Sequence, residues 1–189
     1  HWQGDLLRRM YPDHELTYLP FPSLVTDEMK QSTMELPDDL PLKPGFILFV
    51  GRVKLYKGVE RVIDAVRHCR RLQEIGFVIA GAGALSDDQP LPPGVVWLNR
   101  YILDGEVAAL MRAASVVVYP YLQATQSGVV SIASYFDRPM VLSDIPFFRE
   151  VGADTDGVTL VDVNDRQALT TALLSAATLG DDIPTRDIY

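Results

Sequence analysis

Two cations, Arg52 and Lys57, lie in a short loop bounded by Gly51 and Gly58. Arginine offers a planar fork of donors and lysine a compact point charge, so the pair suits a phosphate or a diphosphate. The two glycines have no Cβ and let the backbone approach such a ligand closely. The loop therefore predicts an anion site, although a strand–loop–helix with two solvated cations is also consistent with these residues.

The segments on either side place this loop at the end of a buried strand. The apolar run at 46–50 predicts the strand, and apolar residues at helical spacing from Val59 to Cys69 predict a helix near 58–72. Open α/β sheets bind their ligands at the carboxyl ends of such strands. The loop is thus expected at the ligand-binding end of a sheet.

Apolar strands and helices alternate through the rest of the chain. Further strands are expected at 77–80, 95–98, 115–119, 139–143 and 158–161, and further helices at 104–114, 128–136, 147–151 and 165–178. Asp104 and Asp165 are expected to cap the first and the last of these helices. The alternation predicts an α/β fold with a doubly wound, Rossmann-like parallel sheet.

The chain also divides by composition. Residues 1–45 are irregular, with a weak strand at 16–19 and several prolines, and we expect them to be a connector from a missing N-terminal domain. Residues 46–180 are expected to form the sheet domain and 181–189 a tail. The chain opens on His1 without an initiator Met, which fits an excised piece of a longer protein.

Composition excludes several classes of function. The 189 residues are 48% hydrophobic, enough for a full core, and the net charge of −8 argues against a nucleic-acid partner. Cys69 is the single cysteine, and the three histidines are scattered, so neither a disulfide nor a metal site is indicated. No apolar run approaches the ~20 residues that a membrane span needs.

Short motifs follow one another through residues 46–180 in a familiar order. They are Gly51-Arg52…Lys57-Gly58, Val78–Gly83, Leu98…Ile102, Ser115–Pro120, Ser127-Gly128-Val129, Arg138–Val141 and Asp144…Val151. In this order and spacing the chain resembles the C-terminal, donor-binding domain of the GT-B retaining glycosyltransferases, in the large group 1 family. The resemblance implies one half of a two-domain GT-B enzyme.

The resemblance implies roles for these residues. Arg52 and Lys57 would clamp the donor diphosphate and stabilise its departure, so that no metal and no cofactor is required. The other donor-binding positions would be Gly51, Ile102, Gln126, Ser127, Gly128, Val129 and Glu150. Backbone near Ile102 would face the nucleobase, and helix-start amides at 127–129 would face the phosphates. For Glu150 a helix-start carboxylate is the alternative role.

One departure from the family concerns a Glu-x7-Glu pair that most members carry around the phosphate-binding helix. Its two positions fall near Ala124 and on Ile132, and neither residue is acidic. The donor sugar and the ribose of the nucleotide would then be held by other groups. This departure leaves open a second interpretation, a non-catalytic relative that keeps the fold for binding or assembly.

A third interpretation is a Rossmann oxidoreductase, because residues 81–86 imitate part of the dinucleotide-binding fingerprint. The third glycine position of that fingerprint holds Ser86, and residues 87–90 do not open a helix. The fingerprint needs strand, turn and helix together, which argues against an NAD site.

The function implied by the resemblance is transfer of a sugar from a nucleotide-diphosphate-sugar to an acceptor hydroxyl with retention. The enzyme would be a hexosyltransferase-like protein of polysaccharide biosynthesis. Its partners would be the nucleotide-sugar and the missing N-terminal domain, which would hold the acceptor, so the isolated chain would be inactive. We expect a cytoplasmic location, with peripheral membrane contact through the missing domain. The nucleobase, the sugar and the acceptor stay open.

Overall fold

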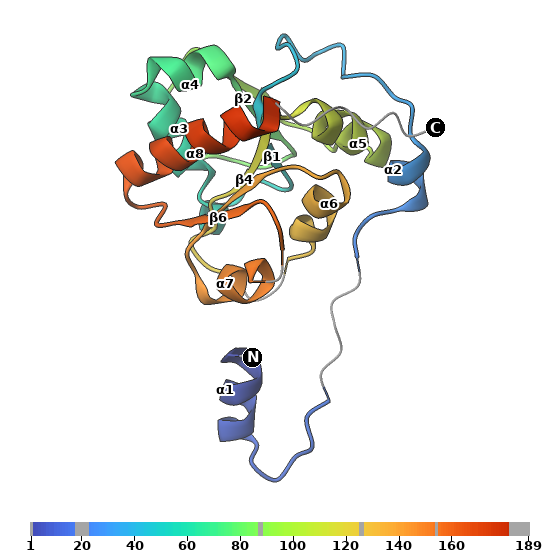
Figure 1. Cartoon of the computed structure of the whole chain (residues 1–189), viewed down its shortest axis with the longest axis vertical. Coiled ribbons are helices and arrows are strands. Elements are labelled where there is room, and N and C mark those ends of the chain that lie inside the picture. The colour runs from blue at the N-terminus through green and yellow to red at the C-terminus, as the bar shows by residue number, and fades with distance from the viewer. Residues whose placement is uncertain (1, 18–22, 87–88, 125–126, 154, 182–189) are drawn as a thin grey trace.

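The computed structural model describes residues 2–17, 23–86, 89–124, 127–153 and 155–181 (Figure 1). Six strands form one sheet in the order β3-β2-β1-β4-β5-β6, and every neighbouring pair is parallel. The strands are β1 (Ile47–Val50), β2 (Phe77–Ala80), β3 (Val95–Leu98), β4 (Val116–Tyr119), β5 (Met140–Ser143) and β6 (Val158–Val161). The predicted doubly wound α/β fold is confirmed.

Helices cover both faces of this sheet, while the first helix of the chain, α1, lies apart from it (Figure 1). They are α1 (Trp2–Met10), α2 (Asp27–Gln31), α3 (Val59–Arg67), α4 (Arg70–Ile75), α5 (Asp104–Ala113), α6 (Val129–Tyr135), α7 (Pro146–Gly152) and α8 (Arg166–Asp181), with the 3-10 turn η1 (Leu55–Lys57). Helices α3, α4 and α8 pack together, while α5 packs against α2 and β1. Right-handed crossovers require this division, because the chain moves outward from β1 in one direction and from β4 in the other.

The burial of each strand depends on its position in the sheet. Every residue of β1, β2, β4 and β5 is buried, whereas the edge strands β3 and β6 are partly exposed. Strands covered by helices on both faces are apolar at every position, which explains the continuous runs at 47–50 and 116–119. The sheet is thus a rigid frame for the loops at its ends.

The helix expected near 58–72 is two helices, so that prediction was wrong. The break lies at His68 and Cys69, between α3 and α4. The side-chain amide of Gln73 donates to the carbonyls of Val66 (3.0 Å) and Arg67 (3.2 Å) at the end of α3, and the Val66 carbonyl also accepts from the Cys69 amide at 3.2 Å. This local compensation lets α4 turn away from α3 before β2 begins.

The two predicted caps had different outcomes. Asp165 does cap α8, because its Oδ1 accepts from the amides of Gln167 (2.9 Å) and Ala168 (3.0 Å). Asp104 does not cap α5: it is the first residue of the helix, and its carboxylate accepts from the Thr26 hydroxyl at 2.8 Å. The cap contact comes instead from Glu106, whose carboxylate accepts from the Leu103 amide at 2.9 Å.

The segment that leads into β1 packs on the sheet domain from residue 24 onward. Leu24 donates its amide to Ser131 on α6, and Arg112 on α5 donates to the carbonyl of Met34. Leu16 and Thr17 are not in a strand, and 18–19 lie outside the described residues. The division of the chain at residue 46 remains a prediction.

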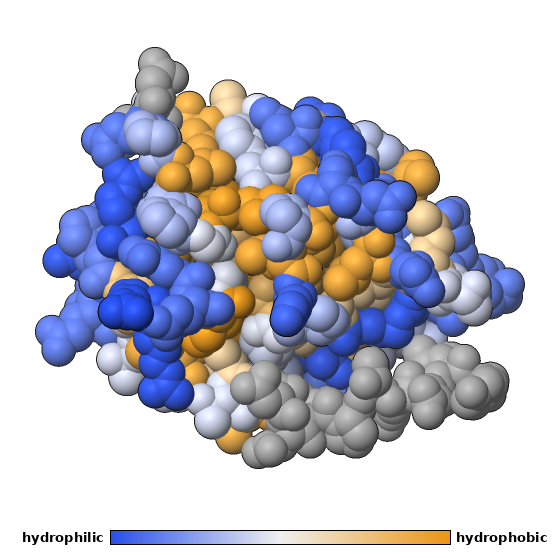
Figure 2. Space-filling model, turned by 90° about the horizontal axis from the view of Figure 1, so that it is seen from above, coloured by the Kyte–Doolittle hydropathy of each residue, from blue (hydrophilic) through white to orange (hydrophobic). Residues whose placement is uncertain are grey.

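The end of the molecule near α4 and the segment entering β1 is shown in Figure 2. Apolar side chains gather at the centre of this face, inside a rim of hydrophilic residues. This is the amino end of the strands. The Gly51–Gly58 loop lies at the opposite end of the sheet, so the two surfaces are separate (Figure 1).

Candidate functional site

The Gly51–Gly58 loop lies at the switch point of the sheet. Strands β1 and β4 are hydrogen-bonded neighbours, and the chain winds outward from them in opposite directions. The loop after β1 and the segment after β4, Pro120–Ala124, therefore leave the sheet side by side. A crevice at this place is where open α/β sheets bind ligands.

Gly58 holds the two loops together. Its φ is +64°, and a Cβ added there would lie 2.0 Å from the carbonyl oxygen of Pro120. Next to this contact, the Leu122 amide donates to the carbonyl of Tyr56 at 2.8 Å. Glycine is needed both for the left-handed backbone and for the close approach.

The glycines after β2 have a similar packing role. A Cβ on Gly81 would lie 2.2 Å from the carbonyl oxygen of Gly51, and one on Gly83 would lie 2.1 Å from that of Val53. The Val53 amide also donates to Ala82 at 2.9 Å. Residues 81–86 form no helix. Their resemblance to the dinucleotide fingerprint is therefore explained by contact between two loops, which argues further against NAD.

Lys57 is half-buried against aromatic rings. Its Nζ lies 4.9 Å from the ring centroid of Tyr121 and 6.0 Å from that of Phe49. Burial lowers the pKa of Lys57 below its ordinary value, and the positive charge of Arg52 lowers it further. Within the described chain neither cation pairs with a carboxylate. A bound anion would offset the energetic cost of desolvating the Lys57 ammonium. It would also offset the repulsion between Lys57 and Arg52.

The start of α6 faces the same region. Ser127 is half-buried, Gly128 is buried, and Val129 is the first helical residue. Gly128 has φ −87° and ψ 3°, which other residues adopt without strain, so glycine is not required there by backbone angle. Gln126 lies outside the described residues.

Tyr121 is a residue that the sequence analysis missed. It is only 2% exposed, and its hydroxyl makes no hydrogen bond of ordinary geometry to the residues that the structure describes. Burial raises the pKa of the phenol to about 12, an effect that the nearby Ser127 side chain partly offsets. A tyrosine directly after the Pro120 that ends a strand was the available signal. It places a hydroxyl-bearing ring beside the Arg52–Lys57 loop.

A family comparison agrees with this geometry. The family described as "Glycosyl transferases group 1" matches residues 44–178. The chain belongs to this family. The remaining positions of the site can therefore be compared with those expected for group 1 glycosyltransferases.

Two curated relatives are phosphatidyl-myo-inositol mannosyltransferases. The protein from Mycolicibacterium smegmatis is 28% identical over 148 residues, covering 72% of this chain and 38% of the relative. The protein from Mycobacterium leprae is 31% identical over 137 residues, covering 68% and 36%. The chain thus spans less than two fifths of the length of either relative.

Solved structures of glycosyltransferases share the fold. WaaG, a glycosyltransferase involved in lipopolysaccharide biosynthesis, superposes with a TM-score of 0.61 at 18% identity, covering 89% of this chain and 52% of WaaG. The trehalose-6-phosphate synthase OtsA superposes with a TM-score of 0.62 at 16% identity, covering 83% and 42%. Both show that the sheet is the GT-B type of Rossmann-like domain.

The remaining residues implied by the family have mixed placements. Ile102 follows β3, and it is 8% exposed and belongs to the core. Glu150 lies in the second turn of α7, which begins at Pro146. The alternative role of Glu150 as a helix-start carboxylate was therefore wrong. Whether either residue contacts a donor remains a prediction.

The two positions of the missing acid pair are apolar in the structure as well. Ile132 on α6 is 5% exposed within the core, and Ala124 packs against the core from the loop after β4. Burial of Ile132 shows that α6 turns this position inward. A carboxylate there would be desolvated unless the helix shifted.

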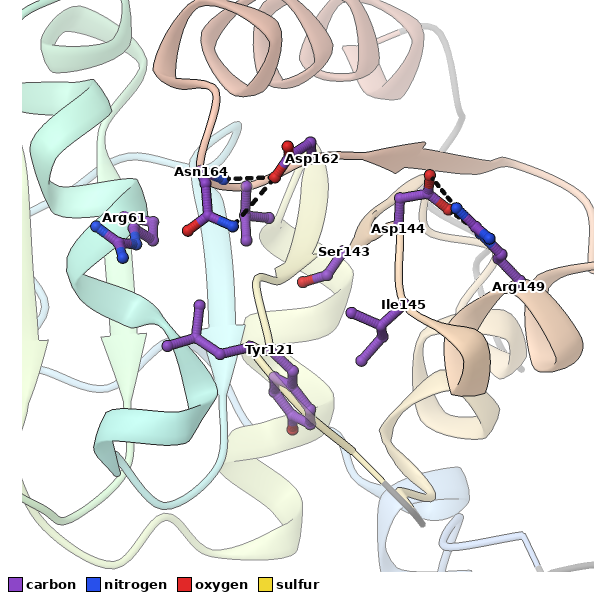
Figure 3. Close-up of a pocket in the computed structure, with 10 residues that line it drawn as sticks. Arg61, Tyr121, Ser143, Asp144, Ile145, Arg149, Asp162 and Asn164 are labelled. Atoms are coloured by element: carbon purple, nitrogen blue, oxygen red, sulfur yellow. Dashed lines mark hydrogen bonds and ion pairs between the residues drawn. The ribbon is translucent and has the colours of Figure 1, made fainter. Parts of the chain in front are cut away.

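A separate cavity of about 470 Å³ opens at the carboxyl ends of β5 and β6 (Figure 3). Arg61, Ser143 and Asn164 line it, and Asp144 beside it pairs with Arg149 at 2.8 Å. The Tyr121 ring points away from Ser143 and Asn164 in Figure 3. Tyr121 and Leu122 line this cavity as well, so the loop after β4 borders both the cavity and the Arg52–Lys57 loop.

Among the described residues, no three histidine, cysteine or acidic side chains are grouped so that they would hold a metal ion. Nor does any described helix have the length and apolar character to span a membrane.

Proposed function

We propose that this chain is the donor-binding half of a glycosyltransferase that uses a nucleotide-diphosphate-sugar and transfers a hexosyl group to an acceptor hydroxyl with retention. One observation carries the proposal: Arg52 and Lys57 lie at the switch point without carboxylate partners in the described chain. Like charges held near each other favour an anionic ligand with more than one charge, and a diphosphate has that character.

The chemistry would be largely electrostatic. As the bond from sugar to diphosphate breaks, negative charge grows on the phosphate oxygens. Arg52 and Lys57 would stabilise this charge, aided by the first amides of α6. Lys57 would contribute most, because partial burial against Phe49 and Tyr121 keeps water from weakening its field. Because these groups neutralise the leaving group, the proposed reaction requires neither metal nor cofactor.

The acceptor would bind to a domain that precedes this chain. Both mannosyltransferase relatives are more than twice as long as the matched region, which supports such a domain. The isolated chain is then expected to bind donor without transferring sugar. Mannosyl transfer in the relatives supports a hexose donor, and retention rests on the family resemblance.

The test is nucleotide binding to the 189-residue chain. A thermal-shift screen of nucleoside diphosphates should reveal at least one that raises the melting temperature, because a ligand of the native state stabilises it. Lys57→Met and Arg52→Ala should then weaken that ligand on the order of 100-fold in calorimetry. Lys54→Met is the matched control, since Lys54 is an exposed lysine of the same loop. Equal affinity in Lys57→Met and Lys54→Met would overturn the proposal, as would selective binding of NAD.

The second candidate is a non-catalytic relative that binds donor or partner without transfer. The apolar Ala124 and Ile132 at the positions of the acid pair favour it. A sugar-transfer assay on the protein with its preceding domain separates the two. Transfer above the rate of donor hydrolysis excludes the non-catalytic candidate.

A further inference from the structure

Tyr121 carries a buried hydroxyl that donates no hydrogen bond within the described part of the chain. Its hydroxyl is enclosed by protein and makes no hydrogen bond of ordinary length and angle to the described residues, although the Ser127 side chain is close enough to lower its pKa. Its ring is held in place by Tyr56, Tyr119 and Phe148, at centroid distances of 6.3, 5.9 and 5.3 Å. Leaving such a group unpaired costs folding free energy, and an unpaired donor beside an anion site can be satisfied by the ligand.

The surroundings of this hydroxyl belong to the anion site. Lys57 Nζ lies 4.9 Å from the Tyr121 ring, and the Ser127 side chain is close enough to the phenol to affect its pKa. Tyr121 also lines the cavity beside Ser143, although its ring points away from Ser143 (Figure 3). Tyr121 therefore lies between the cation loop after β1 and the start of α6.

We propose that Tyr121 is a further ligand-binding residue, whose hydroxyl donates a hydrogen bond to a diphosphate oxygen of the nucleotide. This inference rests on the proposed function and adds a recognition group to the same site. Phosphate oxygens only accept hydrogen bonds, so they need donors on every side. With a pKa of about 12, the phenol keeps its proton across the neutral range and stays a donor.

Tyr119 provides a matched control within the same chain. It is also buried, its hydroxyl also lacks a partner, and its ring contacts Phe49 and Tyr121 at 6.1 and 5.9 Å. Within the described residues no cation lies over its ring. Tyr121→Phe and Tyr119→Phe thus remove the same atom from similar environments, and only one of them borders the anion site.

The experiment measures the affinity of the best nucleoside diphosphate from the thermal-shift screen, with inorganic pyrophosphate as a competitor. Tyr121→Phe should weaken both ligands by about ten-fold, since the lost bond is to a charged group. Tyr119→Phe should leave both affinities unchanged. Neither variant should melt below the wild type without ligand, because each removes only an unpaired hydroxyl.

The outcomes separate this inference from the proposed function. If Lys57→Met loses the nucleotide while Tyr121→Phe binds like the wild type, the inference is overturned and the proposed function stands. Weakening of the nucleotide but not of pyrophosphate would place the hydroxyl on the nucleoside and overturn the inference. If no nucleoside diphosphate binds the wild type, both are overturned.

Discussion

The switch-point loops and the corner around α5 differ in whether their charged groups form ion pairs. At the switch point, which comprises residues 51–58 and 120–124, Arg52 and Lys57 have no carboxylate partner and the Tyr121 hydroxyl makes no hydrogen bond of ordinary geometry among the described residues. At the α5 corner, which comprises residues 24–40, Arg100 and α5, charged groups form a closed network. The comparison teaches that charge pairing here serves the fold, while its absence indicates a ligand site.

Arg100 is the centre of the α5 corner. It donates to both carboxylate oxygens of Glu106, at 2.7 and 2.9 Å, and to those of Asp39, at 3.1 and 3.2 Å. The Arg100 guanidinium lowers the pKa of both carboxyl groups and has its own pKa raised. The segment leading into β1 is thereby tied to the sheet domain.

The largest effect is expected from Gly58→Ala, which would break the switch point itself. The new Cβ would meet the Pro120 carbonyl at 2.0 Å on a backbone with φ +64°. Strain and clash together should lower the free energy of unfolding by on the order of 3 kcal/mol and abolish nucleotide binding. Urea unfolding and calorimetry measure the two effects.

Gly157→Ala is the control for backbone strain alone. Gly157 also has a left-handed φ, +73°, but its nearest neighbour would be the Pro139 Cα at 3.7 Å. Its cost should be about 1 kcal/mol, with no loss of binding. A cost for Gly58→Ala no greater than that of Gly157→Ala would show that the contact with Pro120 is not needed.

A smaller effect is expected from Glu106→Gln at the α5 corner. Glu106 has a folded-state pKa below its ordinary value of 4.5, so its stabilisation is present above that value and is lost as pH falls through the folded pKa. The variant should lose about 1–2 kcal/mol at pH 7 and show a flatter decline below about pH 5. Denaturant unfolding across pH 3–7 measures this.

Asp39→Asn is the weaker arm of that experiment, because Asp39 is the exposed partner of the same arginine. It should change stability less than Glu106→Gln does. Parallel pH profiles for wild type and Glu106→Gln would contradict the role of this pair in the fold.

The smallest effect should have the opposite sign. Lys57→Met removes a half-buried ammonium that has no carboxylate partner in the described part of the chain, and it leaves an apolar chain of similar length against Phe49 and Tyr121. Without ligand, the variant should be as stable as the wild type or more stable by up to about 1 kcal/mol. Destabilisation in a thermal melt would mean that Lys57 supports the fold and would weaken the contrast with Arg100.

The sequence by itself determined the features that depend on neighbours along the chain. The apolar runs specify buried parallel strands, the spacing after Gly58 specifies a helix, and Asp165 caps α8 through amides two and three residues away. The cation loop at the end of β1 is another feature that the sequence determined without tertiary contacts. Its position follows from local pattern and from the general rule for α/β sheets.

Only the tertiary structure decided the features that depend on distant partners. Arg100 meets Asp39 across 61 positions of sequence, and Gly58 meets Pro120 only because β1 and β4 are neighbours in the sheet. The break at His68, the inward turn of Ile132 and the unpaired hydroxyl of Tyr121 likewise depend on which elements pack together. Local periodicity carries no information on these contacts, because it records which face is apolar and not what covers that face.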